Sequence, residues 1–598
     1  TSLESIVIPA TLKSAGRDSW DDLGVLSNSS IKSVVFEEGI ENIPDAESLD
    51  NLLELIVLCL QPIREKLKRA IFITSGYRSP ELNKIGELKN QKILFVIDGV
   101  NEGLGESLWN NHIENLEADI LLALKNQTEK YIADKKFYNA KINIDSLETV
   151  IDFGILDNSL KSGENLSWLQ DAKNQIENYY QSEIADYHVK QVENPSVPKM
   201  ISGTVTVWVD KGIKIEKGLG YSDISIGSGF FIDERGYIVT NYHVIESEVN
   251  PEYEGYSRLY IKTSEDFETK IPAKVVGYDS VMDLALLKAE ITPDFVFQLG
   301  SSENLEIGDQ IYAIGSPLGL EKTITSGIIS TTDRKITTMG TVMQIDASVN
   351  AGNSGGPAVS KEGLVQGVVF AGIEGSQGLN FAIPVEYLKN EVFALYNGGE
   401  VLHPWLGFYG KTYKDAETQS EIGVEILYSI PGEALSLCGV ENGKILTKID
   451  GKTVKNENQL QDILIGYGTD KIATVTVLDL KTGEEEEKLV FLESRPERPG
   501  DIILSSAKEY SAFYPLFGME ITPISSDFKK EFLITRVVKG SVADNAGFSE
   551  NDPIKIVKTK IVEGGDYFYA EVFGKKRKNG YLEATMAIAA PMDSTNFF

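Results

Sequence analysis

The chain has 598 residues, which at roughly 150 residues per domain corresponds to about four domains. Its 42% hydrophobic and 24% charged residues are typical of globular domains, and a formal net charge of -32 disfavours binding to nucleic-acid backbones or anionic lipid. The two cysteines, Cys59 and Cys438, are too far apart in the chain to indicate a metal cluster or a disulfide framework, and the longest apolar run, residues 52–60, is much shorter than the ~20 residues of a membrane span. We therefore expect several globular cores, no metal or other cofactor, no nucleic-acid partner and no membrane span.

Residues 1–164 contain three partial resemblances and no complete motif. Residues 5–9 and 33–39 repeat at a spacing of 28, as in a leucine-rich repeat array, but two copies cannot bury a solenoid core. The string from Ile73 resembles zinc D-alanyl carboxypeptidases without their metal ligands, and the string from Lys92 resembles signal-transduction NTPases without a phosphate-binding loop. We expect an α/β or mosaic region of unassigned fold that serves recognition, spacing or assembly.

The next two segments differ in their residue patterns. Residues 165–199 have a helical period and predict a helical connector. In residues 200–398, short Val- and Ile-rich runs alternate with glycine turns, which predicts an all-β barrel or sandwich closed by a helix.

A nucleophilic serine needs a histidine base, and the chain has four histidines: His112, His188, His243 and His403. His243 follows the strand-like string GYIVTN. His112 and His188 lie in segments whose residue pattern is helical, and His403 lies in a linker beside Pro404. The strand end makes His243 the candidate base.

The candidate nucleophile is Ser354, within VNAGNSGGPAV at residues 349–359. Glycines on both sides permit positive φ, so the amides of Gly352 and Ser354 can point to one place and form an oxyanion hole, although a plain glycine-rich hairpin has the same composition. Asp283, which opens the apolar string DLALLK, is the candidate partner of the histidine, and Asp279 is its rival. The order histidine, aspartate, serine within an all-β region is more specific than any of its parts.

An internal repeat follows residue 400 at an offset of 108. In each copy a glycine precedes a short helix, a second glycine and an apolar strand, so that Gly432 and Gly439 correspond to Gly540 and Gly547. This predicts two small domains of one type, which we place at residues 401–495 and 502–598. The Pro-containing stretch 493–501 predicts an extended linker between them.

Together these motifs resemble the HtrA (DegP-like) family of trypsin-fold serine proteases. The matching strings are GSGFFIDERGYIVTNYHVI, DLALLK, AIGSPLGLEKTITSGIIS, QIDASVNAGNSGGPAV and GLNFAIPVEYL. The resemblance implies a trypsin-like double β-barrel protease followed by two α+β PDZ-like domains. One departure is Ala351, where the family more often has proline, and alanine should leave the chemistry intact.

The resemblance also implies roles for single residues. His243 would be the general base, Asp283 its orienting partner and Ser354 the nucleophile, and the oxyanion site would be made by the amides of Gly352, Asn353 and Ser354. Ser348 stands six residues before the nucleophile, where trypsin-like enzymes that select basic side chains carry an acid. With Ser348 uncharged and Val349 beside it, we expect a small or aliphatic side chain before the scissile bond.

The PDZ-like domains imply peptide binding. In the first, the amides of Leu406, Gly407 and Phe408 would receive a peptide C-terminus that adds as a strand. In the second, the weaker counterparts are Phe517, Gly518 and Met519. Because a fold alone does not establish binding, either copy could instead only brace the protease.

We therefore expect an ATP-independent serine endopeptidase that cleaves unfolded or misfolded polypeptides. The family resemblance further implies trimers or larger homo-oligomers and a bacterial envelope location, most often periplasmic. Two alternatives stay open: a proteolytically silent PDZ adaptor or chaperone, and a protease to which residues 1–164 add an independent sensor.

Overall fold

A computed structural model describes most of the chain after residue 123. The described residues are 6–7, 34–35, 121, 124–153, 163–184, 194–216, 219–316, 323–372, 379–507, 510–524, 531–562, 564–576 and 582–598. The strings from Ile73 and Lys92 lie outside them, as do Cys59, His112 and His188. Within the described part, no helix is both long and apolar enough to cross a membrane.

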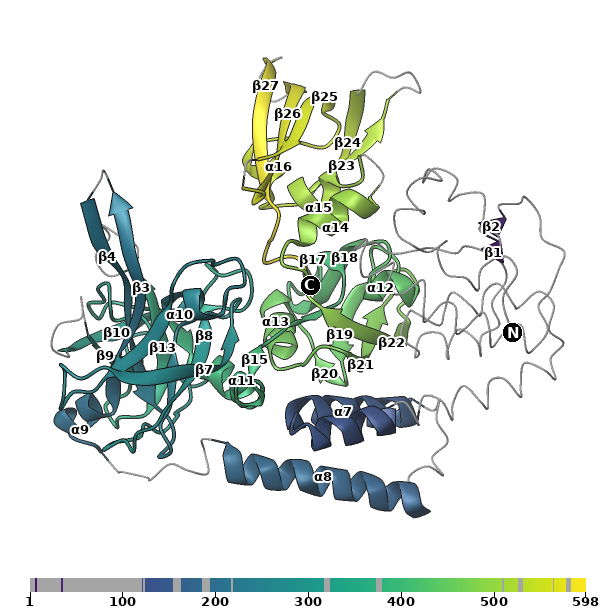
Figure 1. Cartoon of the computed structure of the whole chain (residues 1–598). Helices are drawn as coiled ribbons and strands as arrows, with labels where there is room; N and C mark the ends of the chain where they lie inside the picture. The colour runs from purple at the N-terminus through teal and green to yellow at the C-terminus, as the bar shows by residue number, and fades with distance from the viewer. Residues whose placement is uncertain are drawn as a thin grey trace.

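The described N-terminal elements are two short strands and two helices. β1 (Ile6–Val7) and β2 (Val34–Val35) pair in parallel with Ile6 opposite Val34, the spacing at which the two N-terminal strings repeat. α7 (Phe137–Asp152) and α8 (Gly163–Glu183) pack together, and α8 covers much of the segment expected to be helical. Figure 1 shows these helices below the first PDZ-like domain, where the Ser146 hydroxyl of α7 accepts a hydrogen bond from the Ile472 amide (3.0 Å).

The first β-barrel follows α9 (Val197–Ser202). Its strands are β3 (Thr204–Glu216), β4 (Leu219–Phe231), β5 (Tyr237–Thr240), β6 (Arg258–Lys262), β7 (Ile271–Asp279) and β8 (Leu284–Ala289). They pair in the order β7-β6-β3-β4-β5-β8, and β7 also pairs with β8, which closes the barrel. Strand alternation directs Val205, Val207 and Val209 inward, where all three are buried. α10 (Tyr242–Val249) follows β5 and packs on the barrel.

The second β-barrel has six strands in the closed order β10-β11-β14-β13-β12-β9. They are β9 (Gln310–Gly315), β10 (Thr323–Arg334), β11 (Val342–Ile345), β12 (Pro357–Val359), β13 (Val365–Gly372) and β14 (Asn380–Pro384). α11 (Val385–Asn397) then returns to the first barrel, where β15 (Gly399–Glu400) pairs with β7. The predicted double β-barrel is thus confirmed.

The first PDZ-like domain is a sheet with two helices. Its elements are β16 (Pro404–Trp405), β17 (Phe408–Lys414), β18 (Glu421–Ser429), α12 (Ala434–Leu437), β19 (Ile445–Ile449), β20 (Lys452–Thr453), α13 (Glu457–Ile465), β21 (Lys471–Leu478) and β22 (Glu485–Ser494). The sheet order is β16-β22-β21-β19-β18-β17, with β20 paired to β19. β17 is therefore an edge strand.

The second PDZ-like domain has a five-stranded sheet in the order β23-β24-β25-β26-β27. Its elements are α14 (Pro499–Ser506), α15 (Phe513–Phe517), β23 (Met519–Pro523), β24 (Glu531–Val537), α16 (Val542–Asn545), β25 (Pro553–Ile561), β26 (Tyr567–Lys576) and β27 (Leu582–Pro591). The stretch 493–501 is not extended throughout, because α14 already begins at Pro499, a residue suited to a first helical turn.

The two PDZ-like domains share a local design. The short helices α12 and α16 lie 108 residues apart, as the repeat predicted. Gly407 and Gly518 have φ values of 76° and 71°, and a Cβ on them would lie 2.0 Å from Cβ of Glu433 and 2.2 Å from Cβ of Ser541. Glycine is thus required at both loops. The copies differ at α13, since no helix stands between β25 and β26 in the described residues there.

Candidate active site

His243 and Asp283 form a hydrogen-bonded pair at one end of the first barrel. His243 is the second residue of α10, and its Nδ1 lies 2.7 Å from Oδ2 of Asp283. Oδ1 of Asp283 accepts a second hydrogen bond, from the backbone amide of His243 (2.8 Å). Both carboxylate oxygens thus fix the orientation of the histidine. The His243 side chain remains 46% exposed, so its other ring nitrogen is accessible.

The backbone at Asp283 is specialised for this contact. Asp283 has φ of 55°, a left-handed conformation that aspartate tolerates better than most residues. The Asn241 side chain, just before α10, donates to the Asp283 carbonyl (2.8 Å) and ties the two turns together. The turn between β7 and β8 is therefore held against the start of α10 by the residues that flank the pair.

Ser354 lies beside β4 and the end of β5, the strand that leads to His243. The Ser354 carbonyl accepts a hydrogen bond from the Ser228 amide of β4 (2.7 Å). A Cβ added to Gly355, whose φ is 85°, would lie 2.4 Å from Oγ1 of Thr240, at the end of β5. The serine loop of the second barrel thus packs against the strands that lead to His243, and the three predicted catalytic residues share one region.

The Ser354 hydroxyl points to a backbone acceptor. Its Oγ donates to the Phe370 carbonyl of β13 at 3.0 Å. In the described part of the chain no hydrogen bond joins Ser354 to His243. The Ser354 side chain would have to leave the Phe370 carbonyl before it could bond to His243.

The amides around Ser354 divide into two kinds. The Asn353 amide donates to the Asn350 carbonyl within a turn (3.0 Å), whereas the amides of Gly352 and Ser354 have no acceptor among the described residues. Gly352 has φ of 98°, a backbone conformation that favours glycine. Gly352 and Ser354 are thus the donors left for an oxyanion, and Asn353 shapes the turn instead.

Ser228 is a positioning residue that the sequence analysis did not identify. Its buried hydroxyl donates to the Gly352 carbonyl (2.6 Å) and accepts from the Ser316 amide (2.9 Å). Its own backbone carbonyl accepts from the Thr240 hydroxyl (2.7 Å). The sequence signal was present as the string GSG at residues 227–229, but the partner segments lie up to 126 residues away, at Ser354.

The residues expected to line the specificity pocket lie on the segment between β11 and the nucleophile. Ser348 is exposed, and its carbonyl accepts from the Thr325 hydroxyl (2.9 Å). Val349 packs against an apolar cluster of the second barrel that includes Ile345 and Ala347. Residues 373–378, which follow β13, lie outside the described residues, so the role of Ser348 and Val349 stays a prediction.

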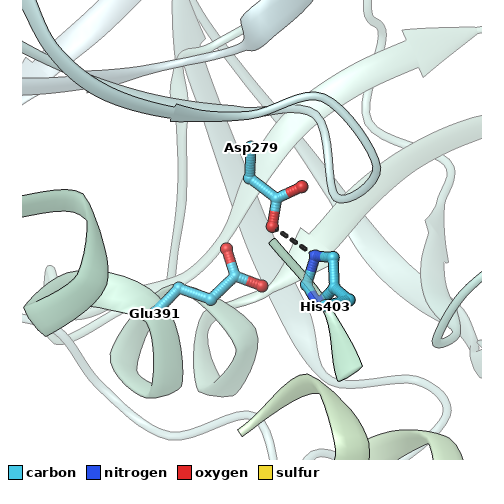
Figure 2. A group of neighbouring side chains, drawn as sticks. All are labelled: Asp279, Glu391 and His403. Carbon is cyan, nitrogen blue, oxygen red and sulfur yellow. Dashed lines mark hydrogen bonds and ion pairs between the residues drawn. The ribbon is translucent and has the colours of Figure 1, made fainter. Parts of the chain in front are cut away.

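Asp279, the rival carboxylate, belongs to a different histidine. Its Oδ2 lies 2.7 Å from Nε2 of His403, and its Oδ1 accepts from the amides of Val281 and Met282. Figure 2 shows that the carboxylate of Glu391, on α11, faces the same pair. Asp279, Glu391 and His403 are all buried, so this pair cannot serve a substrate. His403 lies in the irregular segment between β15 and β16, as expected of a linker, but it is buried and joins the first PDZ-like domain to the barrel.

The pKa values of the two carboxyls in this buried cluster are shifted in opposite directions. Burial raises the pKa of the Glu391 carboxyl well above its usual range, and the Asp279 charge adds to that rise. Burial would also raise the pKa of Asp279, but the charge and hydrogen bond of His403 lower it. The ligand atoms of the three side chains lie within 4.8 Å of one another, the only such group found in the described residues. The raised pKa favours a protonated Glu391 beside the Asp279–His403 hydrogen bond.

The predicted peptide-binding loop is occupied by the chain itself. The amides of Gly407 and Phe408 both donate to the Phe598 carbonyl, at 2.8 and 3.1 Å. Leu406 is buried behind the loop, and its carbonyl accepts from the Leu435 amide (3.0 Å). Of the three loop residues predicted, two therefore contact the occupant directly.

Two six-stranded β-barrels with a histidine, an aspartate and a serine at their junction define a trypsin-like serine protease. The comparisons agree: residues 227–368 match a family model described as a trypsin-like peptidase domain, and residues 500–592 match one described as a TP0546 family PDZ domain.

The similar proteins include two named "Probable periplasmic serine endoprotease DegP-like". The one from Rhizobium meliloti (strain 1021) is 31% identical over 385 residues, covering 61% of this chain and 73% of the relative. The one from Marinomonas sp. (strain MWYL1) is 30% identical over 354 residues, covering 56% and 72%. Among solved structures, "HtrA-type protease AlgW with decapeptide" has a TM-score of 0.42 and 23% identity, covering 50% of this chain and 98% of that one. The chain belongs to the DegP-like family of serine endoproteases, and its enzyme class is serine protease.

Proposed function

We propose that the chain is an ATP-independent endopeptidase that hydrolyses unfolded polypeptides with His243, Asp283 and Ser354 as its catalytic triad. The observation that carries the proposal is the His243–Asp283 pair at 2.7 Å, exposed on the histidine side and packed beside the loop of Ser354. A phosphate-binding loop is absent from the sequence, which supports independence from ATP.

The reaction proposed is acyl transfer. Ser354 leaves the Phe370 carbonyl, His243 accepts its proton, and the serine oxygen attacks the peptide carbonyl to form a tetrahedral intermediate. His243 then protonates the leaving amine, and a water molecule activated by the same histidine hydrolyses the acyl-enzyme. Asp283 orients the ring and stabilises its charged form, as its two hydrogen bonds to His243 suggest.

The oxyanion formed in this reaction would be bound by two amides. Those of Gly352 and Ser354 are free for it, whereas the Asn353 amide is engaged in its turn. Each preorganised donor of this kind is typically worth about 3 kcal/mol in the transition state. Ser348 and Val349 would contact the side chain before the scissile bond, with a preference for small or aliphatic groups.

The first PDZ-like domain would bind peptide C-termini, and the protease would act in a bacterial envelope, in the periplasm that the names of its relatives give. β17 is an edge strand of its sheet and pairs with Phe597 in antiparallel register, which supports the binding role. Assembly into trimers or larger homo-oligomers is a further proposal, which light scattering of the purified protein tests.

The test is degradation of casein by wild type and by Ser354→Ala without ATP. We expect wild type to degrade casein and the variant to lose activity by a factor on the order of 10⁴ or more. Equal and negligible rates would instead favour the alternative function, a silent PDZ adaptor or chaperone.

A further inference from the structure

The last residues of the chain form an added strand on the first PDZ-like domain. Phe598 exchanges hydrogen bonds with Phe408: its amide donates to the Phe408 carbonyl (3.0 Å), and its carbonyl accepts from the Phe408 amide (3.1 Å). Two residues earlier, the Asn596 carbonyl accepts from the Gly410 amide (3.0 Å). Phe597 stands opposite Tyr409 in antiparallel register. Figure 1 shows this end of the chain beside β17, away from the sheet of the second PDZ-like domain.

Side chains of this strand are fitted as closely as its backbone. Phe598 is 2% exposed and stacks on the Phe408 ring, with centroids 5.2 Å apart and planes at 28°. Phe597 points to the other face, where its ring meets Tyr409 edge-on and belongs to the buried cluster that joins the two PDZ-like domains. The alternation is that of a β-strand, so the two rings are buried in different clusters.

Helix α13 forms the second wall of the groove. Its Gln461 side chain donates to the Thr595 carbonyl (2.8 Å), and its Glu457 accepts from the Asn596 side chain. Gln461 is 1% exposed, so it is committed to this contact. The strand is thus held by an edge strand on one side and a helix on the other, the arrangement of a bound peptide ligand.

In the part of the second PDZ-like domain that the structure describes, there is no comparable pairing of an edge strand with a helix. Its β25 and β26 are joined by a hairpin, so the described residues include no helix in the place of α13. Phe517 and Met519, the weaker counterparts of the binding loop, are fully buried. This domain therefore presents the ligand instead of receiving one.

We propose that residues 594–598 are an intramolecular ligand of the groove between β17 and α13, and that the Phe598 ring is the main side-chain contact that holds them there. The proposal rests on the peptide-binding role assigned to the first PDZ-like domain under the proposed function. An external peptide must displace the bound segment, which is present at the high effective concentration of a tethered ligand, so its apparent affinity falls by the ratio of filled to open groove.

The occupied groove is also connected to the protease. The Gln461 side-chain oxygen accepts from the amide of Gly340 (3.2 Å), in the loop between β10 and β11, while its nitrogen holds Thr595. The next residue of α13, Asp462, accepts a hydrogen bond from the Tyr387 hydroxyl, and this hydroxyl accepts one from the Thr341 amide. An exchange of ligand in the groove therefore changes a side chain that contacts the second barrel directly.

The experiment measures binding of a fluorescent peptide, Ser-Thr-Asn-Phe-Phe, by anisotropy. All proteins carry Ser354→Ala so that the peptide is not cleaved. Phe598→Ala removes the ring from the groove while leaving Phe597 in its own cluster, and Tyr567→Ala is the control, since Tyr567 is a half-exposed aromatic residue of the same domain. We expect Phe598→Ala to bind roughly 10–100-fold more tightly than its parent, as burial of one aromatic ring predicts. Tyr567→Ala should match the parent.

A peptide ending in Ala-Ala should bind none of these proteins measurably. Equal affinity of the parent and Phe598→Ala for Ser-Thr-Asn-Phe-Phe would overturn self-occupancy, and no binding to either would overturn the peptide-binding role as well. Neither result affects the protease assignment, which casein degradation tests separately. Hydrogen exchange gives a second readout that a folding defect confined to the second domain would not mimic: the Gly407 and Gly410 amides should lose protection in Phe598→Ala and regain it with saturating peptide.

Discussion

The described residues of the protease include two His–Asp pairs with the same N–O distance and different environments. His243 and Asp283 lie 2.7 Å apart, with side chains 46% and 21% exposed, whereas His403 and Asp279 lie 2.7 Å apart with side chains 1% and 0% exposed. The two aspartates flank the same turn between β7 and β8. A hydrogen-bonded imidazole is therefore no sign of catalysis by itself, and access to solvent and to a serine loop is what separates the two pairs.

The buried pair has a structural task. His403 leads into the first PDZ-like domain, Asp279 ends β7, and Glu391 on α11 faces both, so the cluster connects the barrel with the domain that follows. Asp279 also holds the amides of Val281 and Met282 in the turn that carries Asp283. The structural pair thus supports the turn on which the catalytic geometry depends.

Substitution of the two aspartates is expected to give the largest difference in activity between the pairs. Asp283→Asn should lower kcat/KM on a peptide substrate by about 10⁴, because the ring loses the acceptor that fixes its tautomer. Asp279→Asn should instead destabilise the protein by about 3 kcal/mol, since it leaves a buried histidine without its charged partner. At temperatures below its melting temperature, its kcat/KM should stay within about tenfold of the wild-type value. Steady-state kinetics and thermal melting of both variants provide the measurement. The reverse pattern would mean that catalysis belongs to the Asp279–His403 pair, and it would contradict the assignment to Asp283 and His243.

A smaller effect is expected at Ser228, which positions the serine loop next to the exposed pair. Ser228→Ala leaves the Gly352 carbonyl and the Ser316 amide without their buried partner, and we expect kcat to fall roughly 10–100-fold with little change in KM. Thr206→Val is the matched control: Thr206 stands opposite Ser228 in the strand ladder, and its buried hydroxyl has no partner among the described residues. Equal kcat in both variants would exclude the positioning role.

The smallest effect expected is a pH dependence of protein stability that arises from Glu391, beside the buried pair. Glu391 has a raised pKa in the folded protein, so its contribution to stability is complete below its unfolded pKa of about 4.3 and is lost as pH rises toward the folded value. Glu391→Gln cannot ionise, so its melting temperature should exceed that of wild type by an amount that grows from pH 5 to pH 9. Asp279, whose lowered pKa favours folding above its unfolded value, is common to both proteins and cancels.

A flat difference across that range would contradict a protonated Glu391. The same melts with added EDTA or Zn²⁺ test the charge balance: a shift in wild type that is absent in Glu391→Gln would indicate that an ion, and not a proton, neutralises the cluster.

Much of the architecture could be predicted from local patterns. The β-barrels follow from Val- and Ile-rich strands with glycine turns, and the repeat of Gly432 and Gly540 identified two related domains from sequence alone. The three catalytic candidates could be chosen from short strings: a histidine at a strand end, an aspartate at the start of an apolar strand, and a serine between glycines. Asp283, chosen over Asp279, lies beside His243 in the structure, and its catalytic role stays a prediction.

The remaining features depend on distant pairings. His403 could not be recognised as buried, because its partner Asp279 is 124 residues away and the adjacent Pro404 suggested a linker. Ser228 was not singled out for the same reason, since its partners Gly352 and Ser316 are 124 and 88 residues away. Phe598 carried no signal at all, since strand addition uses backbone groups that every residue has and depends on an edge strand 190 positions earlier, at Phe408.

The most direct test of the catalytic assignment is labelling with a fluorophosphonate probe, followed by mass-spectrometric mapping of the modified residue in wild type, His243→Ala and His403→Gln. We predict modification of Ser354 in wild type, its loss in His243→Ala and its retention in His403→Gln at a temperature where that variant is folded. Modification of a different serine, or undiminished labelling of Ser354 in His243→Ala, would contradict it.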